Sequence, residues 1–290
     1  MDIRALSTLV ECRQVADLEQ QIWAYADAED VVPPAVLLIS VKRGGVLLGA
    51  FDAAGDLKGY VYSAPAVKDG RSTLWSHALG VVPEARGRGA GAALKVAQRQ
   101  HALRMGVDLI EWTCDPLQAS SAHLNFAELG IVVEDYEENL YGDSSSALHS
   151  GTPTDRFVAE WHLSTPHVER RLAASARARA GGPDAQRPSP PLSVRDGAVV
   201  AAVLVNPSRG GADCLEPGDV ALDVEAARVL VEIPTRFTGM LRDQPDLAHA
   251  WRMSTRKIFQ SYFGRGYRVV DFFLAREHGR GQYLLARAAS

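Results

Sequence analysis

The residues of this chain that are best suited to chemistry lie at 79–91, where the sequence reads Leu-Gly-Val-Val-Pro-Glu-Ala-Arg-Gly-Arg-Gly-Ala-Gly. An apolar strand ends there, a proline turn follows, and an alanine-rich helix is expected from about Ala90 to Met105. The glycines let consecutive backbone N–H groups close on an anion, and the helix N-terminus and two arginines add positive charge. The loop therefore predicts a pyrophosphate site, and the spacing Arg86-x-x-Gly89-x-Gly91 makes coenzyme A the leading candidate.

Two other interpretations of this loop are weaker. A glycine-rich turn can be no more than a tight connection, but two arginines among three glycines argue against that here. The stretch Gly87-x-Gly89-x-x-Ala92 also fits a dinucleotide fingerprint, with Glu111 as a ribose-binding acid. We reject this second alternative because a Rossmann turn has its first glycine directly after the strand, whereas residues 82–86 intervene here.

Composition limits the classes of protein that fit. The chain has 290 residues, of which 47% are hydrophobic, and this is enough for two domains with full cores. A net charge of -4 gives no basic field for nucleic acid, and no apolar run approaches the ~20 residues of a membrane span. Residues 1–4 lack the apolar core of a signal peptide. The widely spaced Cys12, Cys114 and Cys214 indicate reduced thiols in a cytoplasmic protein and offer no metal cluster.

The chain reads as an α/β (α+β) protein with a linker. Residues 175–191 are rich in Ala, Arg, Gly and Pro and follow a basic helix expected at 166–179, so 166–191 separates a first domain (1–165) from a second (192–290). In the first domain we expect helices at 11–23, 90–105 and 120–129, and strands at 36–41, 45–51, 59–64, 72–81, 107–114, 131–136 and 157–163. In the second we expect a helix at 246–263 and strands at 198–205, 227–233, 267–274 and 282–286. The strands at 72–81 and 107–114 flank the loop and helix and should be parallel.

The stretch 79–91 resembles the acyl-CoA motif of the GNAT superfamily of N-acyltransferases, and the chain is similar to a long, two-domain branch of it. Further similar pieces are Gly49–Asp52, Ser76-His77, Glu111–Leu117, His123–Phe126, Asn139–Gly142, Asp155–Phe157, Trp251-Arg252, Thr255-Arg256 and Gly266-Tyr267. The resemblance implies a GNAT fold with a mixed, splayed central sheet in the first domain. In the second domain, the expected helix at 246–263, the glycines that end it and the strand at 267–274 loosely repeat the helix–Gly–strand arrangement of Phe126–Tyr136, without the phosphate loop. This domain is expected to be a partial GNAT-like α/β domain.

The resemblance also implies a reaction and a set of contacts. An acyl group would pass from acyl-CoA to the amine of a small molecule or amino acid by direct attack, without a metal. The implied coenzyme A contacts are Leu79, Val81, Arg86, Gly87, Arg88, Gly89, Ala90, Gly91, Asn125 and Phe126. One alternative is that the acyl donor is the thioester of a carrier protein. Another is that the protein is a non-catalytic acyl-CoA-binding module. The resemblance leaves open whether the protein forms a homodimer.

Proton transfer requires two further groups. The tyrosine that many GNAT enzymes use to protonate the thiolate corresponds to Phe126 here, which has no proton to give. Tyr141 is the first substitute and Asn125 a weaker one, unless the thiolate leaves unassisted. For the base we favour His77, on the face of the strand that also carries Trp75 and Leu79, because imidazole has a suitable pKa.

Other charged residues complete the predicted site. Glu111 and Asp115 are the alternative bases, at the end of the neighbouring strand where the substrate cleft should open. Asp115 is also a candidate substrate contact. Arg252 and Arg256, at i and i+4 on one helix face, could bind a carboxylate of the acceptor or of the acyl group. We expect the second domain to close the acceptor side of the cleft with these arginines. Surface or interdomain ion pairs are the alternative for both.

Overall fold

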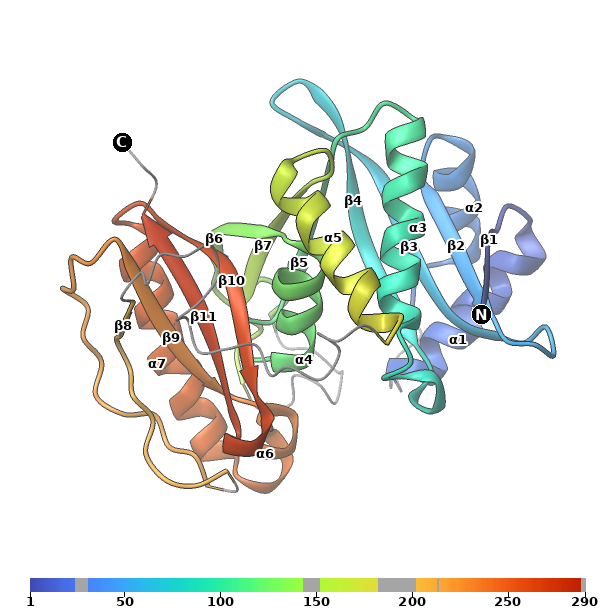
Figure 1. Ribbon diagram of the computed structural model, residues 1–290. Coiled ribbons are helices and arrows are strands. Elements are labelled where there is room, and N and C mark those ends of the chain that lie inside the picture. Colours follow the sequence, from blue (N-terminus) through green and yellow to red (C-terminus); the bar gives the residue numbers. More distant parts are fainter. Residues whose placement is uncertain (24–30, 143–151, 182–201, 213, 288–290) are drawn as a thin grey trace. The chain divides into compact units, whose positions relative to one another are not determined.

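The computed structural model describes residues 1–23, 31–142, 152–181, 202–212 and 214–287 (Figure 1). The described chain forms two compact units. The first comprises Met1–Trp112 and Glu160–Thr165, and the second comprises the remaining described residues from Thr113 onward. Residues 182–191 of the expected linker lie outside the described residues, and the domain boundaries 1–165 and 192–290 stay a prediction.

The first unit is built on a mixed sheet with the strand order β1-β2-β3-β4-β5 (Figure 1). These strands are β1 (Asp2–Ala5), β2 (Val46–Phe51), β3 (Leu57–Lys68), β4 (Arg71–Val81) and β5 (Leu109–Cys114, of which 109–112 belong to this unit). The helices are α1 (Leu9–Trp23), α2 (Pro34–Lys42) and α3 (Ala90–Arg104), with the short helix η2 (Pro83–Ala85) before α3. The strands pair antiparallel except for β4 and β5, which are parallel as predicted. The mixed α/β class is thereby confirmed.

Residues 36–41 form part of helix α2, so the strand predicted there is wrong. A short apolar run fits a strand and a packed helix equally well, and periodicity does not separate them. The local signal that decides is Pro34 at the first helical position, where its fixed φ favours a helix and its missing N–H is not needed. The carbonyl of Pro33 then accepts hydrogen bonds from Val36 and Leu37.

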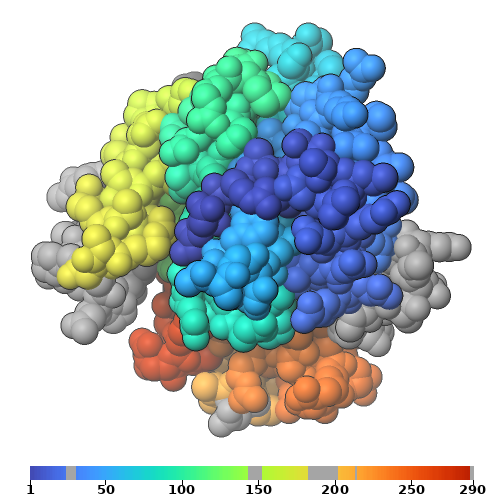
Figure 2. All heavy atoms as spheres, turned by 90° about the vertical axis from the view of Figure 1, so that its right-hand side faces the viewer, coloured from blue at the N-terminus to red at the C-terminus, as the bar shows by residue number. Residues whose placement is uncertain are grey.

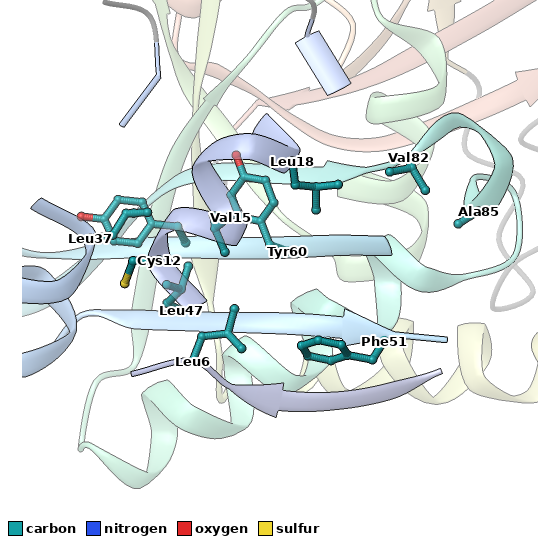
Figure 3. Packing of buried hydrophobic residues seen from close by; sticks show 11 residues of the cluster. Leu6, Cys12, Val15, Leu18, Leu37, Leu47, Phe51, Tyr60, Val82 and Ala85 are labelled. Atoms are coloured by element: carbon teal, nitrogen blue, oxygen red, sulfur yellow. The ribbon is translucent and has the colours of Figure 1, made fainter. Parts of the chain in front are cut away.

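One face of this sheet packs against α1 and α2 (Figure 3). The buried side chains that form this cluster are Leu6, Cys12, Val15, Leu18, Leu37, Leu47, Phe51, Tyr60, Tyr62, Val82 and Ala85. Helix α1 begins with a capping box: the backbone N–H of Thr8 donates to Glu11 Oε2 at 3.0 Å, and the N–H of Glu11 donates to Thr8 Oγ1 at 3.3 Å. The outer side of α1 is exposed at the surface (Figure 2).

The second unit has the strand order β7-β6-β10-β11-β9-β8. Its strands are β6 (Val132–Glu137), β7 (Arg156–His162, of which 156–159 belong to this unit), β8 (Val203–Leu204), β9 (Arg228–Pro234), β10 (Tyr267–Ala275) and β11 (Arg280–Arg287). Its helices are α4 (Ala119–Ala122), the π-helical η3 (His123–Leu129), α5 (Pro166–Arg179), α6 (Phe237–Asp243), α7 (Pro245–Phe263) and the short η4 (Arg276–His278). The elements predicted here are present, although residues 198–201 of the strand expected at 198–205 lie outside the described residues. Within the described chain, no helix combines the length and apolar character that crossing a membrane requires.

Candidate functional site

The loop between β4 and α3 has the backbone of an anion-binding turn. Gly87 and Gly89 have φ values of 72° and 80°, in the left-handed region that favours glycine. Gly89 is the N-cap of α3 and provides no side-chain cap. The first N–H groups of a helix have no acceptor within it, so those at the start of α3 are available to a negatively charged ligand.

Two arginines of the loop are exposed, as a contact with a dissolved anion requires. Arg86 and Arg88 both lie at the surface, while Ala90 is buried. Arg86 Nε donates a hydrogen bond of 2.9 Å to the carbonyl of Val81, the last residue of β4. This bond holds the guanidinium against the end of the strand and occupies one of the backbone groups at which a coenzyme A contact is predicted.

Strand β4 separates from β5 before it reaches the loop. The parallel ladder between them has two registered pairs, Leu74 with Ile110 and Trp75 with Glu111. Strand β4 then continues to Val81 in register with β3 on its other side. The edge of β4 beyond Trp75 therefore lies outside the ladder with β5, as expected for a splayed sheet.

A β-bulge lies in this separated part of β4. The register with β3 pairs Ser76 with Ser63 and Ala78 with Tyr62, so His77 is the extra residue between two pairs. A bulge bends the strand and re-aims a side chain, and bulges are common next to active sites. The sequence does not reveal this one because no glycine or proline marks it.

Because of the bulge, two residues of β4 that would otherwise share a face of the sheet point to opposite faces. The side chain of Ser76 is hydrogen-bonded to α3, whereas Ala78 packs in the cluster under α1 and α2. In an unbroken strand, residues 76 and 78 would share a face. Leu79 alternates with Ala78 and therefore lies on the opposite face of the strand, whereas the His77 ring contacts Tyr62 of the cluster. The prediction that His77 and Leu79 lie on one face is therefore wrong.

His77 has the properties of a proton acceptor. The residue is exposed, and its ring lies edge-on to that of Tyr62, with 5.9 Å between the ring centroids. Desolvation by the neighbouring protein atoms lowers the pKa of the imidazole below its ordinary value, even though the residue keeps access to solvent. A lowered pKa keeps the ring neutral at pH 7, the form that can accept a proton.

Glu111 is held in an ion pair in the same unit. Lys68 Nζ lies 2.8 Å from Glu111 Oε1 and also contacts Glu160, while the Thr73 hydroxyl lies 3.5 Å from the other carboxylate oxygen of Glu111. The side chain of Glu111 is buried. A role for Glu111 as the base would require the ammonium group to move away, so His77 is the better placed candidate.

The second unit contains Asn125 and Phe126 in η3. Both are buried. The Phe126 ring packs edge-on against Phe157 and Tyr283, with centroids 6.5 and 5.5 Å away, and Asn125 Nδ2 donates to Ser121 Oγ at 3.3 Å. Phe126 is therefore part of an aromatic core, with no hydroxyl at the position of the expected tyrosine.

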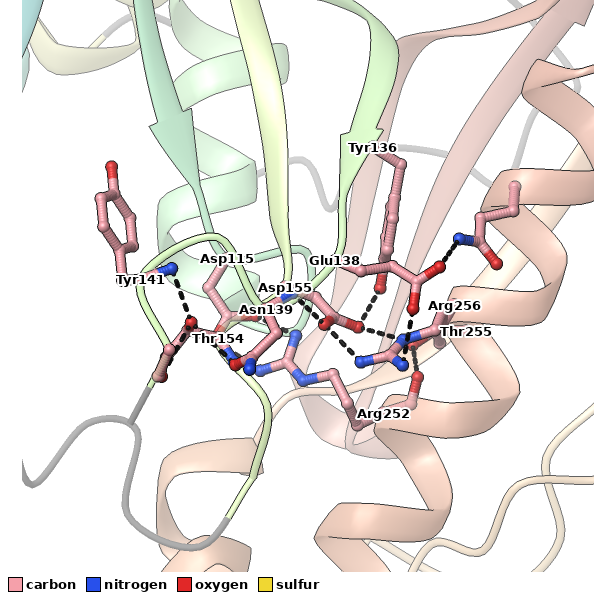
Figure 4. A network of polar contacts seen from close by, with 12 residues as sticks. Asp115, Tyr136, Glu138, Asn139, Tyr141, Thr154, Asp155, Arg252, Thr255 and Arg256 are labelled. Carbon is pink, nitrogen blue, oxygen red and sulfur yellow. Dashed lines mark hydrogen bonds and ion pairs between the residues drawn. The ribbon is translucent and has the colours of Figure 1, made fainter. Parts of the chain in front are cut away.

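Tyr141 is an exposed residue whose hydroxyl has a partner in the second unit. The residue is 53% exposed, its hydroxyl lies 2.8 Å from Thr113 Oγ1, and the Arg156 guanidinium lies 5.1 Å from its ring centroid. Its backbone N–H donates to Thr154 Oγ1 at 3.0 Å, which fixes the turn that carries it (Figure 4). Tyr141 therefore has the hydroxyl that Phe126 lacks, on an exposed residue.

Arg252 and Asp115 form a buried, bidentate ion pair (Figure 4). The two nitrogen–oxygen distances are both 2.8 Å, and the side chains are 1% and 3% exposed. Burial by itself would raise the pKa of Asp115, but the charge and hydrogen bonds of Arg252 lower it. Each residue therefore has its partner inside the protein, rather than the accessible charge that binding a substrate requires.

Arg256 is similarly bound to Asp155. Its Nε and Nη2 lie 2.8 and 2.6 Å from the two carboxylate oxygens of Asp155, and Nη1 donates to Glu138 at 2.9 Å (Figure 4). The Tyr136 hydroxyl donates to Asp155 at 2.6 Å, and burial, followed by the charge of Asp155, raises its pKa. Sequence reasoning missed Asp155 as a partner because no local spacing relates it to Arg256. Of the two interpretations of the arginines, ion pairs within the protein describe what the structure places around them.

Comparisons with known proteins place acetyltransferases among the similar structures. No protein-family model matches the sequence, and no curated protein matches it. The protein yncA of Salmonella typhimurium, solved with its cofactor acetyl-CoA, shares 19% identity over 57% of this chain and 95% of its own, with a TM-score of 0.45. An acetyltransferase of the GNAT family from Streptococcus pneumoniae shares 15% identity over 55% of this chain and 97% of its own, with a TM-score of 0.45. The paia N-acetyltransferase of Thermoplasma acidophilum, in complex with coenzyme A, shares 17% identity over 56% of this chain and 98% of its own, with a TM-score of 0.40.

The chain is thus similar to GNAT-family acetyltransferases. The ligands named above are those of the other structures, and the role of each residue here is inferred from its own surroundings. Among the described residues, no group of three or more His, Cys, Asp or Glu side chains could hold a metal ion.

Proposed function

We propose that this protein is an acyltransferase that moves an acyl group from acyl-CoA to the amine of a small molecule or amino acid. The observation that carries the proposal is the loop Arg86–Gly91: two left-handed glycines and two exposed arginines precede a helix N-terminus that has no side-chain cap. Such a loop fits a pyrophosphate group. The edge of β4 beyond Trp75, which lies outside the β5 ladder, fits an extended amide chain that pairs with backbone groups.

The reaction we propose is direct attack by the amine. The nitrogen forms a bond to the thioester carbonyl carbon, and the carbon–sulfur bond breaks to release coenzyme A as a thiolate. A backbone N–H of β4 near the bulge stabilises the negative charge on the carbonyl oxygen. His77 accepts the proton that the nitrogen loses.

The thiolate then takes a proton from water or from Tyr141. Thiols have a pKa of ~8.5, so a thiolate leaves readily near neutral pH and needs only weak assistance. Phe126 cannot assist, and this makes unassisted departure or a contribution from Tyr141 the two routes that we propose.

Coenzyme A binding to a loop variant tests the proposal. Gly89→Val places a β-branched side chain where the backbone must approach the phosphates, and losing hydrogen bonds to a charged group costs about 1.5–3 kcal/mol. We expect the dissociation constant for coenzyme A to rise by ~10- to 100-fold in titration calorimetry. The matched control is Gly55→Val in the β2–β3 turn, where φ is 88° and no atom lies near the added side chain. Equal affinity of the two variants for coenzyme A would overturn the proposal.

A second candidate function is a non-catalytic acyl-CoA-binding module, which is favoured by the burial of Phe126 at the expected position of the acid. Both functions use the same loop, so binding does not separate them. Release of free thiol from acetyl-, succinyl- or malonyl-CoA with a panel of amines does. No release above the rate without protein would support the module.

The donor could also be the thioester of a carrier protein. Such a donor has no adenosine end, so its use would not depend on the arginines of the loop. We propose acyl-CoA as the donor and expect Arg86→Ala and Arg88→Ala to raise the KM for it. Unchanged activity in both variants would favour the carrier protein.

A further inference from the structure

A group of buried polar side chains lies between α3 and the bulge of β4. Ser63, Ser76, Lys95 and Gln98 are between 0% and 5% exposed. Lys95 Nζ donates to Ser76 Oγ at 2.9 Å and lies 3.6 Å from the ring centroid of Trp112. Lysine is rarely buried to this extent, because removing its charge from water is costly unless specific partners compensate. The hydroxyl and the face of the indole ring supply such compensation.

These side chains meet at the place where the strand register changes. Ser63 and Ser76 form the pair that directly adjoins the bulged residue His77. Gln98 Nε2 donates to the hydroxyl of Ser63 and, at 3.0 Å, to that of Ser76. One amide group of α3 therefore connects both strands at the bulge.

The hydrogen bonds give the bulge a fixed position. A bulge interrupts the ladder, and shifting it by one residue would turn the side chains between the two positions to the other face of the sheet. Only one register places the two serine hydroxyls opposite each other below Gln98. Apolar residues at these positions would fill the space but would not distinguish one register from the next.

Helix α3 also begins in the phosphate loop. Lys95 and Gln98 lie about 8 and 12 Å along the axis from the first residue of the helix, at 1.5 Å per residue. The same rigid element thus carries the N-terminal anion site and the side chains that hold the bulge.

We propose that Lys95 and Gln98 are positioning residues that fix the β4 bulge, and with it the imidazole of His77, at a set place relative to the phosphate loop. This inference rests on the proposed function for its catalytic meaning. The effect of Lys95 and Gln98 on His77 can be measured without any reaction. The positioning role and the proposed function can therefore be refuted separately.

The test uses the full-length protein with Gln98→Leu and Lys95→Met, which remove hydrogen bonds and charge while keeping side-chain volume. Arg99→Met is the control, because Arg99 is adjacent on α3 but donates to the carbonyl of Leu163 at 2.8 Å. The first measurement is the pKa of His77 by NMR titration, and the second is coenzyme A affinity. We expect the pKa of His77 to change in both test variants and not in the control, while the coenzyme A dissociation constant changes less than ~3-fold in all three.

The kinetic test is a double-mutant cycle. If Gln98 acts through His77, then Gln98→Leu lowers kcat at least ~10-fold and has no further effect in a His77→Ala background. Should Gln98→Leu fail to fold, Ser63→Ala removes one of the same hydrogen bonds with a smaller change in volume. An unchanged pKa of His77, or multiplicative losses in the double variant, would overturn the positioning role. Absence of transferase activity in the wild-type protein, with a changed pKa of His77 in the variants, would instead refute only the proposed function.

Discussion

Glu19 gives α1 a stability that depends strongly on pH. This carboxyl is 2% exposed, on the inner face of the helix. Burial raises its pKa from 4.5 to about 7, and hydrogen bonds from Val32 and Tyr60 only partly oppose the shift. Because the pKa in the folded state lies above the unfolded value, the neutral carboxyl stabilises the protein fully below pH 4.5. This stability is lost as the pH rises through about 7.

The size of the effect follows from the two pKa values. One pKa unit corresponds to ~1.4 kcal/mol, so ionising Glu19 in the folded protein costs about 3 kcal/mol at high pH. That is a large fraction of the ~5–15 kcal/mol that stabilises a typical domain. Glu19→Gln removes the titration while keeping the shape of the side chain. We expect the difference in the free energy of unfolding between the variant and the wild type to increase by about 3 kcal/mol from pH 4.5 to pH 9.

The assay is urea denaturation of both proteins at several pH values. Groups that titrate identically in the wild type and the variant contribute equally to both free energies of unfolding, so their contributions cancel in the difference. Glu11→Gln on the same helix is the matched control. Hydrogen bonds from Arg4 and from the backbone lower the pKa of Glu11 to about 2, so its contribution is complete above pH 4.5 and is lost only as the pH falls toward 2. The control difference should therefore stay constant between pH 5 and pH 9. A Glu19→Gln difference that is equally constant would show that Glu19 is ionised throughout, and would refute the reasoning.

Three further predictions concern the candidate site. Because the pKa of His77 is lowered, kcat/KM should fall only as the pH drops below about 6.5, and His77→Ala should lower kcat and abolish this dependence; a variant with the same pH profile would exclude His77 as the base. Arg252→Met leaves the charge of Asp115 buried and should cost about 3–5 kcal/mol in urea denaturation, whereas a weaker affinity for the acceptor at unchanged stability would restore the role of Arg252 as a substrate ligand. Phe126→Tyr adds a hydroxyl inside an aromatic core and should cost about 1–3 kcal/mol without raising kcat; a faster variant would mean that the hydroxyl reaches the thiolate.

The sequence predicts most accurately the elements that local chemistry defines. The sequence predicts the limits of α3 and its loop to within one residue of the structure. The residues that mark these limits are Pro83, Gly87, Gly89 and Gly106, each of which restricts or relaxes the backbone by itself. The parallel pairing of β4 and β5 follows from the helix that connects them. These features cover the proposed phosphate site.

The features that escape prediction depend on partners far away in the chain. The bulge at His77 arises from the register between two strands and leaves no mark in the residues themselves. The partners of Arg252 and Arg256 are separated from them by more than a hundred residues. A helical pair of arginines looks the same in the sequence whether it faces solvent or a buried carboxylate, so only the folded chain distinguishes a substrate ligand from an internal ion pair.

If the proposed anion binds at the uncapped start of α3, the stability of the fold depends on the concentration of that ligand. The N-cap Gly89 has no side chain with which to satisfy the first N–H groups of the helix, so a bound anion would complete the helix as a cap residue completes others. A ligand that binds only the folded state stabilises it by about 2.7 kcal/mol when present at a hundred times its dissociation constant. The melting temperature of the protein therefore serves as a gauge of donor affinity, and a thermal-shift screen of acyl thioesters would rank the acyl groups before any acceptor is known.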